Sequence, residues 1–174
     1  MITMTYRFVV LSGLFVLLVL LLSGCGGEKL PPGMPKLHPA TLTVMQDGNP
    51  LPDAEIVMTN TDPAASNWSS GGVTDQNGVL KLRTMGRYEG VPAGTYKVAV
   101  QKIEFPNITL PYEPDTPEKQ KEYDRLSKEM KEHTFYVVDP KFGPGKSEFP
   151  VEITPSNLDV TIDVSPAVRI QVKR

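Results

Sequence analysis

Residues 40–59 read ATLTVMQDGNPLPDAEIVMT and contain two alternating stretches around a turn. Leu42 and Val44 alternate with residues of the opposite face in the first stretch, and Ile56 and Met58 do so in the second. Between them, Asp47-Gly48-Asn49-Pro50 has the composition of a tight turn. Because successive side chains of a strand point to opposite faces, residues 40–59 predict two strands, each with one apolar face.

The same period-2 alternation returns in five further stretches of the chain. They lie at 79–83, 95–101, 148–153, 158–164 and 168–173. Half-buried strands of this kind belong to antiparallel sheets packed face to face, and no helix alternates with them as a parallel α/β sheet would require. We therefore expect residues 40–174 to form an all-β, antiparallel, Ig-like or prealbumin-like sandwich of about seven strands. Pro150 cannot donate to a ladder, so its strand is expected at an edge or with a bulge.

One segment departs from the strand pattern and predicts a helix. Thr116-Pro117 offers an N-cap followed by proline at the first helical position. Ten of the 17 residues from Pro117 to His133 are charged, five of each sign, and a narrow apolar stripe runs through Tyr123, Leu126 and Met130. We expect a surface helix at 117–132 within an insertion at 113–133. It would act either as a lid over the sandwich edge or as a docking helix for a partner.

The N-terminal part of the chain predicts an export signal. Residues 8–22 are almost wholly apolar and follow Arg7; as a helix they would span roughly 22 Å, which is short for a permanent membrane span and suits a signal peptide. The run ends in Leu22-Ser23-Gly24-Cys25, which resembles the lipobox of bacterial lipoproteins. This resemblance implies a signal helix at 1–24, cleavage between Gly24 and Cys25, and acylation of Cys25. The alternative is an uncleaved anchor with a chance cysteine.

Acylation of Cys25 would hold the protein on a membrane through its N-terminal acyl chains. Residues 25–39 then form a lipidated, glycine- and proline-rich tether. Gly26 is not the aspartate that resembles an inner-membrane retention signal. The expected location is therefore the bacterial cell envelope, with the outer membrane favoured.

Composition excludes several classes of function. The formal net charge is -2 over 174 residues, so no basic footprint for nucleic acid is present. A single cysteine excludes an internal disulfide and a zinc site built on several cysteines, and only two histidines are available for a metal. No phosphate loop or persuasive Ser-His-Asp set is present. We therefore expect no catalysis, no metal and no cofactor.

Three ordered motifs resemble a known family. They are residues 47–54 (DGNPLPDA), residues 74–80 (TDQNGVL) and residues 91–98 (VPAGTYKV). In this order they resemble the carboxypeptidase-regulatory-like, or transthyretin-like, domain, and residues 136–164 look like its C-terminal half. The resemblance implies a sandwich that serves as an accessory or binding module. From the residues themselves, Gly48 and Gly78 predict positive φ in turns, and Tyr96 predicts a tyrosine corner.

Few residues suggest a ligand. Asp75 and Asn77 could hold calcium, but no bidentate glutamate follows at loop spacing, so a plain turn is expected. Trp68, the only tryptophan, lies in a polar loop at 60–72 and could stack on a sugar ring together with Tyr88 and Tyr112, or it could fold back over a sheet.

Three functions are compared. The leading hypothesis is a lipid-anchored structural or interaction module that binds an envelope protein or polymer. The alternative is a carbohydrate-binding accessory module of a polysaccharide-processing system. The third is an enzyme with an unrecognised site.

Overall fold

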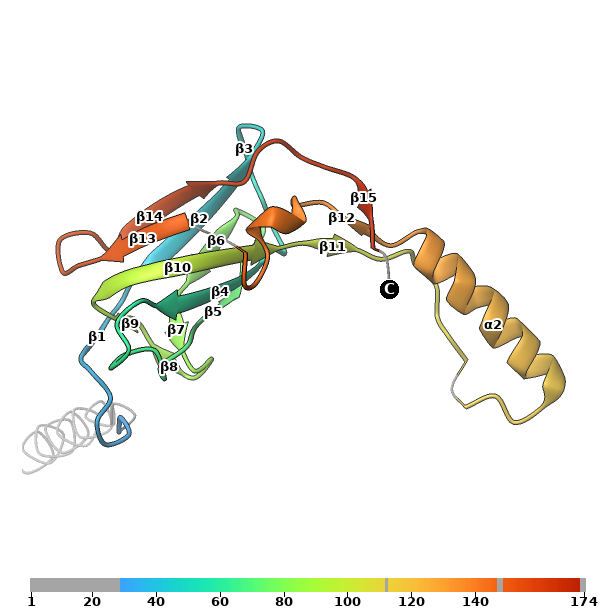
Figure 1. Ribbon diagram of the computed structural model, residues 1–174, viewed down its shortest axis with the longest axis horizontal. Helices are drawn as coiled ribbons and strands as arrows, with labels where there is room; N and C mark the ends of the chain where they lie inside the picture. The colour runs from blue at the N-terminus through green and yellow to red at the C-terminus, as the bar shows by residue number, and fades with distance from the viewer. Residues whose placement is uncertain (1–28, 112, 147–148, 173–174) are drawn as a thin grey trace, which may run out of the picture. The chain divides into compact units, whose positions relative to one another are not determined.

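The computed structural model describes residues 29–111, 113–146 and 149–172. The predicted signal helix, its cleavage site at Gly24 and Cys25, and Tyr112 lie outside these residues. The chain divides into two units, Met1–Pro32 and Gly33–Arg174, and the second unit contains all the strands and helices below (Figure 1). Within the described residues, no helix is long and apolar enough to cross a membrane.

The second unit is a β-sandwich with one inserted α-helix. Its strands are β1 (Leu37–His38), β2 (Thr41–Gln46), β3 (Asn49–Pro50), β4 (Glu55–Asn60), β5 (Ser70–Val73), β6 (Val79–Lys81), β7 (Arg83–Thr84), β8 (Tyr88–Glu89), β9 (Val91–Pro92), β10 (Gly94–Gln101), β11 (Ile103–Glu104), β12 (Phe135–Tyr136), β13 (Phe149–Ile153), β14 (Asp159–Asp163) and β15 (Ile170–Gln171). The helices are α2 (Pro117–Glu132) and the 3-10 turn η1 (Pro140–Phe142).

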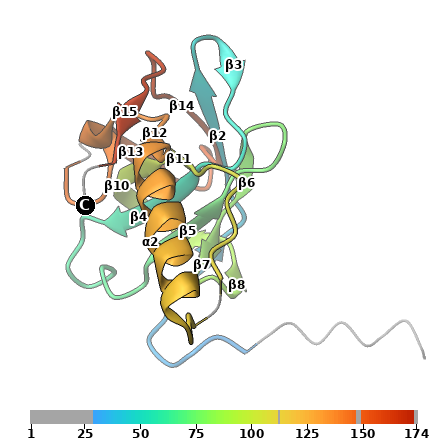
Figure 2. The ribbon, with the colours of Figure 1, turned by 90° about the vertical axis from the view of Figure 1, so that its right-hand side faces the viewer.

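Two sheets enclose the core. The larger has the order β13-β10-β4-β5-β7-β8, and the smaller has the order β14-β2-β3 with β6 also paired to β2. Figure 2, turned so that α2 faces the viewer, shows β2 and β3 on one side and β4 and β5 on the other. The predicted apolar faces meet between them, with Leu42, Val44, Ile56, Met58 and Val98 at most 2% exposed. The predicted all-β sandwich with a single inserted α-helix is confirmed.

The topology differs from the prediction in one pair of strands. β14 pairs with β2 in parallel, from Asp159 opposite Thr41 to Asp163 opposite Met45, whereas the other paired strands are antiparallel. The strand before β14, β13, belongs to the larger sheet, so the chain crosses from one sheet to the other between β13 and β14. After this crossing, β14 runs in the same direction as β2. β13, which carries Pro150, lies at the edge of the larger sheet, as predicted.

Two predictions about individual strands were wrong. The stretch 168–173 has no core face: β15 pairs only with β12 in a separate three-stranded sheet, and Ile170 is 43% exposed. The expected loop at 60–72 begins and ends inside strands, because Asn60 is the last residue of β4 and Ser70–Gly72 belong to β5. Gly71 lies so close to β4 that a Cβ would stand 2.1 Å from the Ile56 carbonyl oxygen. Close approach of the β4 and β5 backbones therefore explains the glycine at position 71, in a stretch whose composition is typical of a loop.

The three quoted motifs occupy fold-determining positions. Asp47 and Gly48, with φ of 50° and 76°, form the two-residue turn between β2 and β3. Asp75 accepts hydrogen bonds from the Asn77 and Val79 amides at 2.8 and 2.9 Å, and Gly78 has a φ of 70°. The buried Tyr96 hydroxyl donates to the Pro92 carbonyl oxygen over 2.6 Å, so the predicted tyrosine corner is present.

Candidate binding surface

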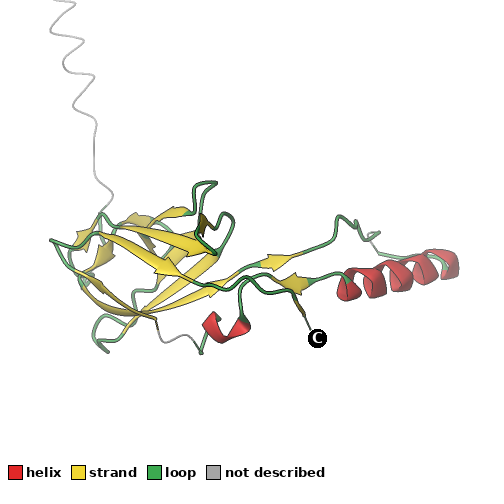
Figure 3. Cartoon of the chain, turned by 90° about the horizontal axis from the view of Figure 1, so that it is seen from above, coloured by secondary structure: helices red, strands yellow, loops and turns green. Residues whose placement is uncertain are grey.

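A three-stranded sheet carries helix α2 away from the core. It has the order β11-β12-β15, and β11 directly continues the path of β10. The Lys102 ammonium group donates to the Pro52 carbonyl oxygen over 2.9 Å. The Gln46 side-chain amide donates to the Val137 carbonyl oxygen over 3.0 Å. Figure 3 shows α2 beyond this sheet, on the side away from the sandwich strands. The lid interpretation of the helix was therefore wrong.

Both ends of α2 are capped, and the N-terminal cap is the one that its sequence predicts. The Thr116 hydroxyl accepts from the Lys119 amide over 3.3 Å, and Pro117 occupies the first helical position. At the other end the His133 amide donates to the Glu129 carbonyl oxygen over 3.1 Å, and the Thr134 hydroxyl donates to the Met130 carbonyl oxygen over 2.6 Å. The helix is thus well bounded without any contribution from the core.

Helix α2 has no buried residue. Its ion pairs, Arg125 to Glu129 at 3.4 Å and Lys128 to Glu132 at 3.9 Å, are exposed and stabilise it by at most about 1 kcal/mol each. Helices in proteins owe most of their stability to packing of an apolar face. The apolar stripe of α2 is only half-buried within this chain.

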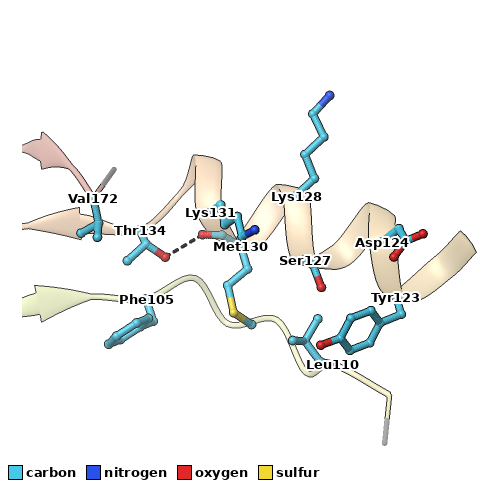
Figure 4. Close-up of a pocket in the computed structure, with 10 residues that line it drawn as sticks. All are labelled: Phe105, Leu110, Tyr123, Asp124, Ser127, Lys128, Met130, Lys131, Thr134 and Val172. Atoms are coloured by element: carbon cyan, nitrogen blue, oxygen red, sulfur yellow. Dashed lines mark hydrogen bonds between the residues drawn. The ribbon is translucent and has the colours of Figure 1, made fainter. Parts of the chain in front are cut away.

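Tyr123 and Met130 of this stripe, together with other residues of α2, form one wall of an open groove of about 560 Å³. The segment that follows β11 forms the opposite wall (Figure 4). The residues that line the groove are Phe105, Leu110, Tyr123, Asp124, Ser127, Lys128, Met130, Lys131, Thr134 and Val172. The volume falls within the usual range for sites that bind small ligands or side chains.

Two residues of the groove are exceptions to ordinary burial rules. Phe105 is 60% exposed, although phenylalanine is usually buried. The Ser127 hydroxyl oxygen is buried and has no hydrogen-bond partner within the described residues, and Figure 4 shows it directed into the groove. The groove thus holds an exposed aromatic ring at one end and, nearer Leu110 and Tyr123, a buried hydroxyl without a partner among the described residues (Figure 4).

Charged side chains of both signs lie at the groove. Its lining includes Lys128, Lys131 and the carboxylate of Asp124, which accepts a hydrogen bond from the Gln120 side-chain amide over 2.9 Å. Lys128 is paired with Glu132 at 3.9 Å, and Figure 4 shows its ammonium group directed away from the groove. Among the described residues, the groove therefore combines apolar walls with one ammonium group that has no ion pair, that of Lys131.

The residues predicted to stack on a sugar do not line this groove. Trp68 is half-buried in the loop after β4, and its amide donates to the Ala65 carbonyl oxygen over 3.1 Å. Tyr88 lies in β8, with the Arg87 guanidinium carbon 5.4 Å from the centre of its ring. No measured contact joins the two rings, so a shared stacking face stays a prediction.

The ionisable groups with shifted pKa values have structural partners. Burial raises the pKa of Tyr96, opposed in part by a hydrogen bond to the Asn60 side chain. The Lys141 amide lowers the pKa of Asp139, and the Ser165 hydroxyl lowers that of Asp163. Within the described residues, no group of three or more histidine, cysteine or carboxylate side chains could hold a metal ion.

The comparisons with known proteins are sparse. No family model and no curated protein matches the sequence. Among solved structures, a 9R-lipoxygenase from Cyanothece PCC8801 aligns over 79% of this chain and 18% of its own, with 16% identity and a TM-score of 0.34. Such a likeness carries no argument about function.

Proposed function

We propose that this chain is a bacterial lipoprotein with a carboxypeptidase-regulatory-like domain that serves as a binding module of the cell envelope. Cys25 would carry the acyl chains, and the sandwich would be the scaffold. Of the predicted tether 25–39, the end is fixed to the domain, because Leu37 and His38 form β1 and pair with β9; the part before β1 would link the lipid to the domain. The observation that carries the proposal is the α2 groove. A helix with no buried residue borders an apolar groove that holds an exposed phenylalanine and an unpartnered buried hydroxyl.

The proposed occupant is a segment of a partner protein with an apolar face and acidic side chains. Apolar side chains would cover Phe105 and Met130, and a carboxylate would approach Lys131. A polar group of the segment would pair with the Ser127 hydroxyl. Docking of an amphipathic segment in a groove is a recurrent mode of recognition.

The test is photo-crosslinking of the full chain in a bacterial host. A benzophenone amino acid replaces Met130 in the groove or, as the matched control, Arg125 on α2 outside it. We expect a discrete adduct from position 130 that is missing from position 125. Mass spectrometry should map this adduct to an apolar protein segment flanked by Asp or Glu.

Charge variants make the test specific. Lys131→Glu should lower the adduct yield at least severalfold, whereas Lys121→Glu, on α2 but outside the groove, should leave it unchanged. An adduct with a lipid, with a glycan or with a second copy of this chain would contradict the proposed occupant, as would equal yields from both crosslinker positions.

The anchor is tested separately. Cys25→Ser should abolish acylation and cleavage, so the protein should run as a larger precursor that still carries the apolar residues 8–22 and takes up no labelled fatty acid. A Cys25→Ser protein that stays with the membrane and is processed normally would refute the lipoprotein assignment.

A further inference from the structure

A second hollow lies on the outer face of the larger sheet and shares no residue with the α2 groove. It measures about 280 Å³ and is lined by Val57, Thr59, Lys97, Ala99, Pro144, Gly145 and Lys146. In the sheet register, Lys97 of β10 stands opposite Thr59 of β4, and Ala99 stands opposite Val57. The floor of the hollow is therefore two neighbouring cross-strand pairs.

The loop that forms the opposite wall is held in place by its own bonds. Asp139 caps η1 by accepting from the Lys141 amide over 2.9 Å, and Phe142 stacks on Phe149 with ring centres 4.7 Å apart. The Lys146 amide donates to the Gly143 carbonyl oxygen over 3.2 Å. The wall covers Ala99, which is only 8% exposed although it points away from the core. The hollow is thus shaped by an ordered turn.

The charge in this hollow is uncompensated within the described residues. Lys97 and Lys146 line it and form no ion pair there, whereas the neighbouring Lys141 is paired with Asp139 at 3.3 Å. Among the residues that the structure describes, which exclude 147 and 148, no carboxylate lines the hollow; Glu55 and Glu152 occupy more distant register positions on the same face, opposite Gln101 and Thr95. Two ammonium groups and one hydroxyl therefore surround an apolar floor.

We propose that this hollow binds an acidic sugar residue of a polysaccharide through its carboxylate. Lys97 and Lys146 would bind the carboxylate by charge-assisted hydrogen bonds, and the Thr59 hydroxyl would pair with a ring hydroxyl. The carbon–hydrogen face of the sugar would lie on Val57 and Pro144. A bare phosphate would leave these apolar side chains uncovered. The proposal does not depend on the α2 groove, and it assigns glycan recognition to residues other than Trp68.

The test uses polygalacturonate as the probe and the full chain in non-ionic detergent. Titration calorimetry should show binding to polygalacturonate and at least about tenfold weaker binding to its methyl-esterified form, which lacks the charge. The double variant Lys97→Gln/Lys146→Gln should lose at least about tenfold in affinity, since both lysines would contact the carboxylate. Both lysines are exposed, so near-ultraviolet circular dichroism should be unchanged.

Matched controls separate this site from general charge attraction. Lys81→Gln/Lys121→Gln removes the same charge from two exposed lysines elsewhere and should retain binding, as should Trp68→Ala. Galacturonate should compete, and inorganic phosphate at equal concentration should compete less. Equal losses in the two double variants, undiminished binding of Lys97→Gln/Lys146→Gln, no binding by the unmodified chain, or stronger competition by phosphate would each overturn the proposal.

Discussion

The Tyr96 hydroxyl illustrates how one polar atom holds a corner of the sandwich. It is buried and donates to the Pro92 carbonyl oxygen over 2.6 Å. Tyr96→Phe leaves that buried acceptor unpaired, so the free energy of unfolding should fall by about 1–3 kcal/mol in urea titrations. Tyr123→Phe, at a half-buried position on α2, is the control and should change it by less than about 0.5 kcal/mol. Equal effects of the two variants would contradict this role of Tyr96.

The size of the side chain at position 71 is limited by the neighbouring strand β4 as well as by the backbone angle of the residue. Its φ is 152°, and an added Cβ would stand 2.1 Å from the Ile56 carbonyl oxygen. Gly71→Ala should therefore lower the free energy of unfolding by about 3 kcal/mol or more, because β5 must move away from β4. Gly86→Ala, at φ 69° but in open space, should cost only about 1–2 kcal/mol. Thermal melts of both variants decide whether this difference exists.

Residues were predictable from sequence where their role is local. Gly48 and Asp75 act within a few residues of themselves, and their turn composition indicates that role. The positive φ of Gly78 was predictable in the same way, but not the close approach of Val44, whose carbonyl oxygen would lie 2.8 Å from an added Cβ. The role of Gly71 was not predictable from the sequence, because it is the Ile56 carbonyl oxygen on another strand that leaves no room for a side chain there. The Ser127 hydroxyl was also missed, because nothing in the sequence indicates which hydroxyls lack a partner.

Among the helices and strands, α2 should lose stability most readily when a single residue is substituted, because it has no buried residue. Thr116→Ala removes the N-cap bond to the Lys119 amide, which should cost the helix about 1 kcal/mol. Hydrogen exchange of the amides at 118–121 should accelerate about fivefold. Ser127→Ala, in the middle of the helix, is the control and should leave exchange there unchanged or slower, since alanine favours helices. Faster exchange in Ser127→Ala than in Thr116→Ala would contradict this account.

Elements were predictable in proportion to their length and periodicity. The five- to eight-residue strands β2, β4, β10, β13 and β14 alternate cleanly, and α2 has a cap, a proline and a stripe. The two-residue strands β11, β12 and β15 are too short to show a period, so the sheet that carries α2 was missed. The stripe of Tyr123, Leu126 and Met130 indicated an incomplete apolar face. Its opposite wall, around Phe105 and Leu110, has no such signal.

At the scale of the whole unit 33–174, the sandwich should be independent of the helical insertion. Residues 106–133 contribute no side chain to the hydrophobic core. Replacing them with a short Gly-Ser linker between β11 and β12 should leave a cooperative thermal transition within a few degrees of the original. A loss of cooperativity, or of the near-ultraviolet signal of Trp68, would show that α2 is part of the folding unit.

The pairing of β2 with β14 also has a consequence for the order of events during biosynthesis. Thr41 and Asp159, which face each other across this pair, are separated by 118 positions. A ribosome releases β2 long before β14, so one edge of β2 stays open until β14 has been made. The sandwich can close only after that point. A chain bound for export, as proposed above, would thus remain loose enough to be threaded through a translocation channel.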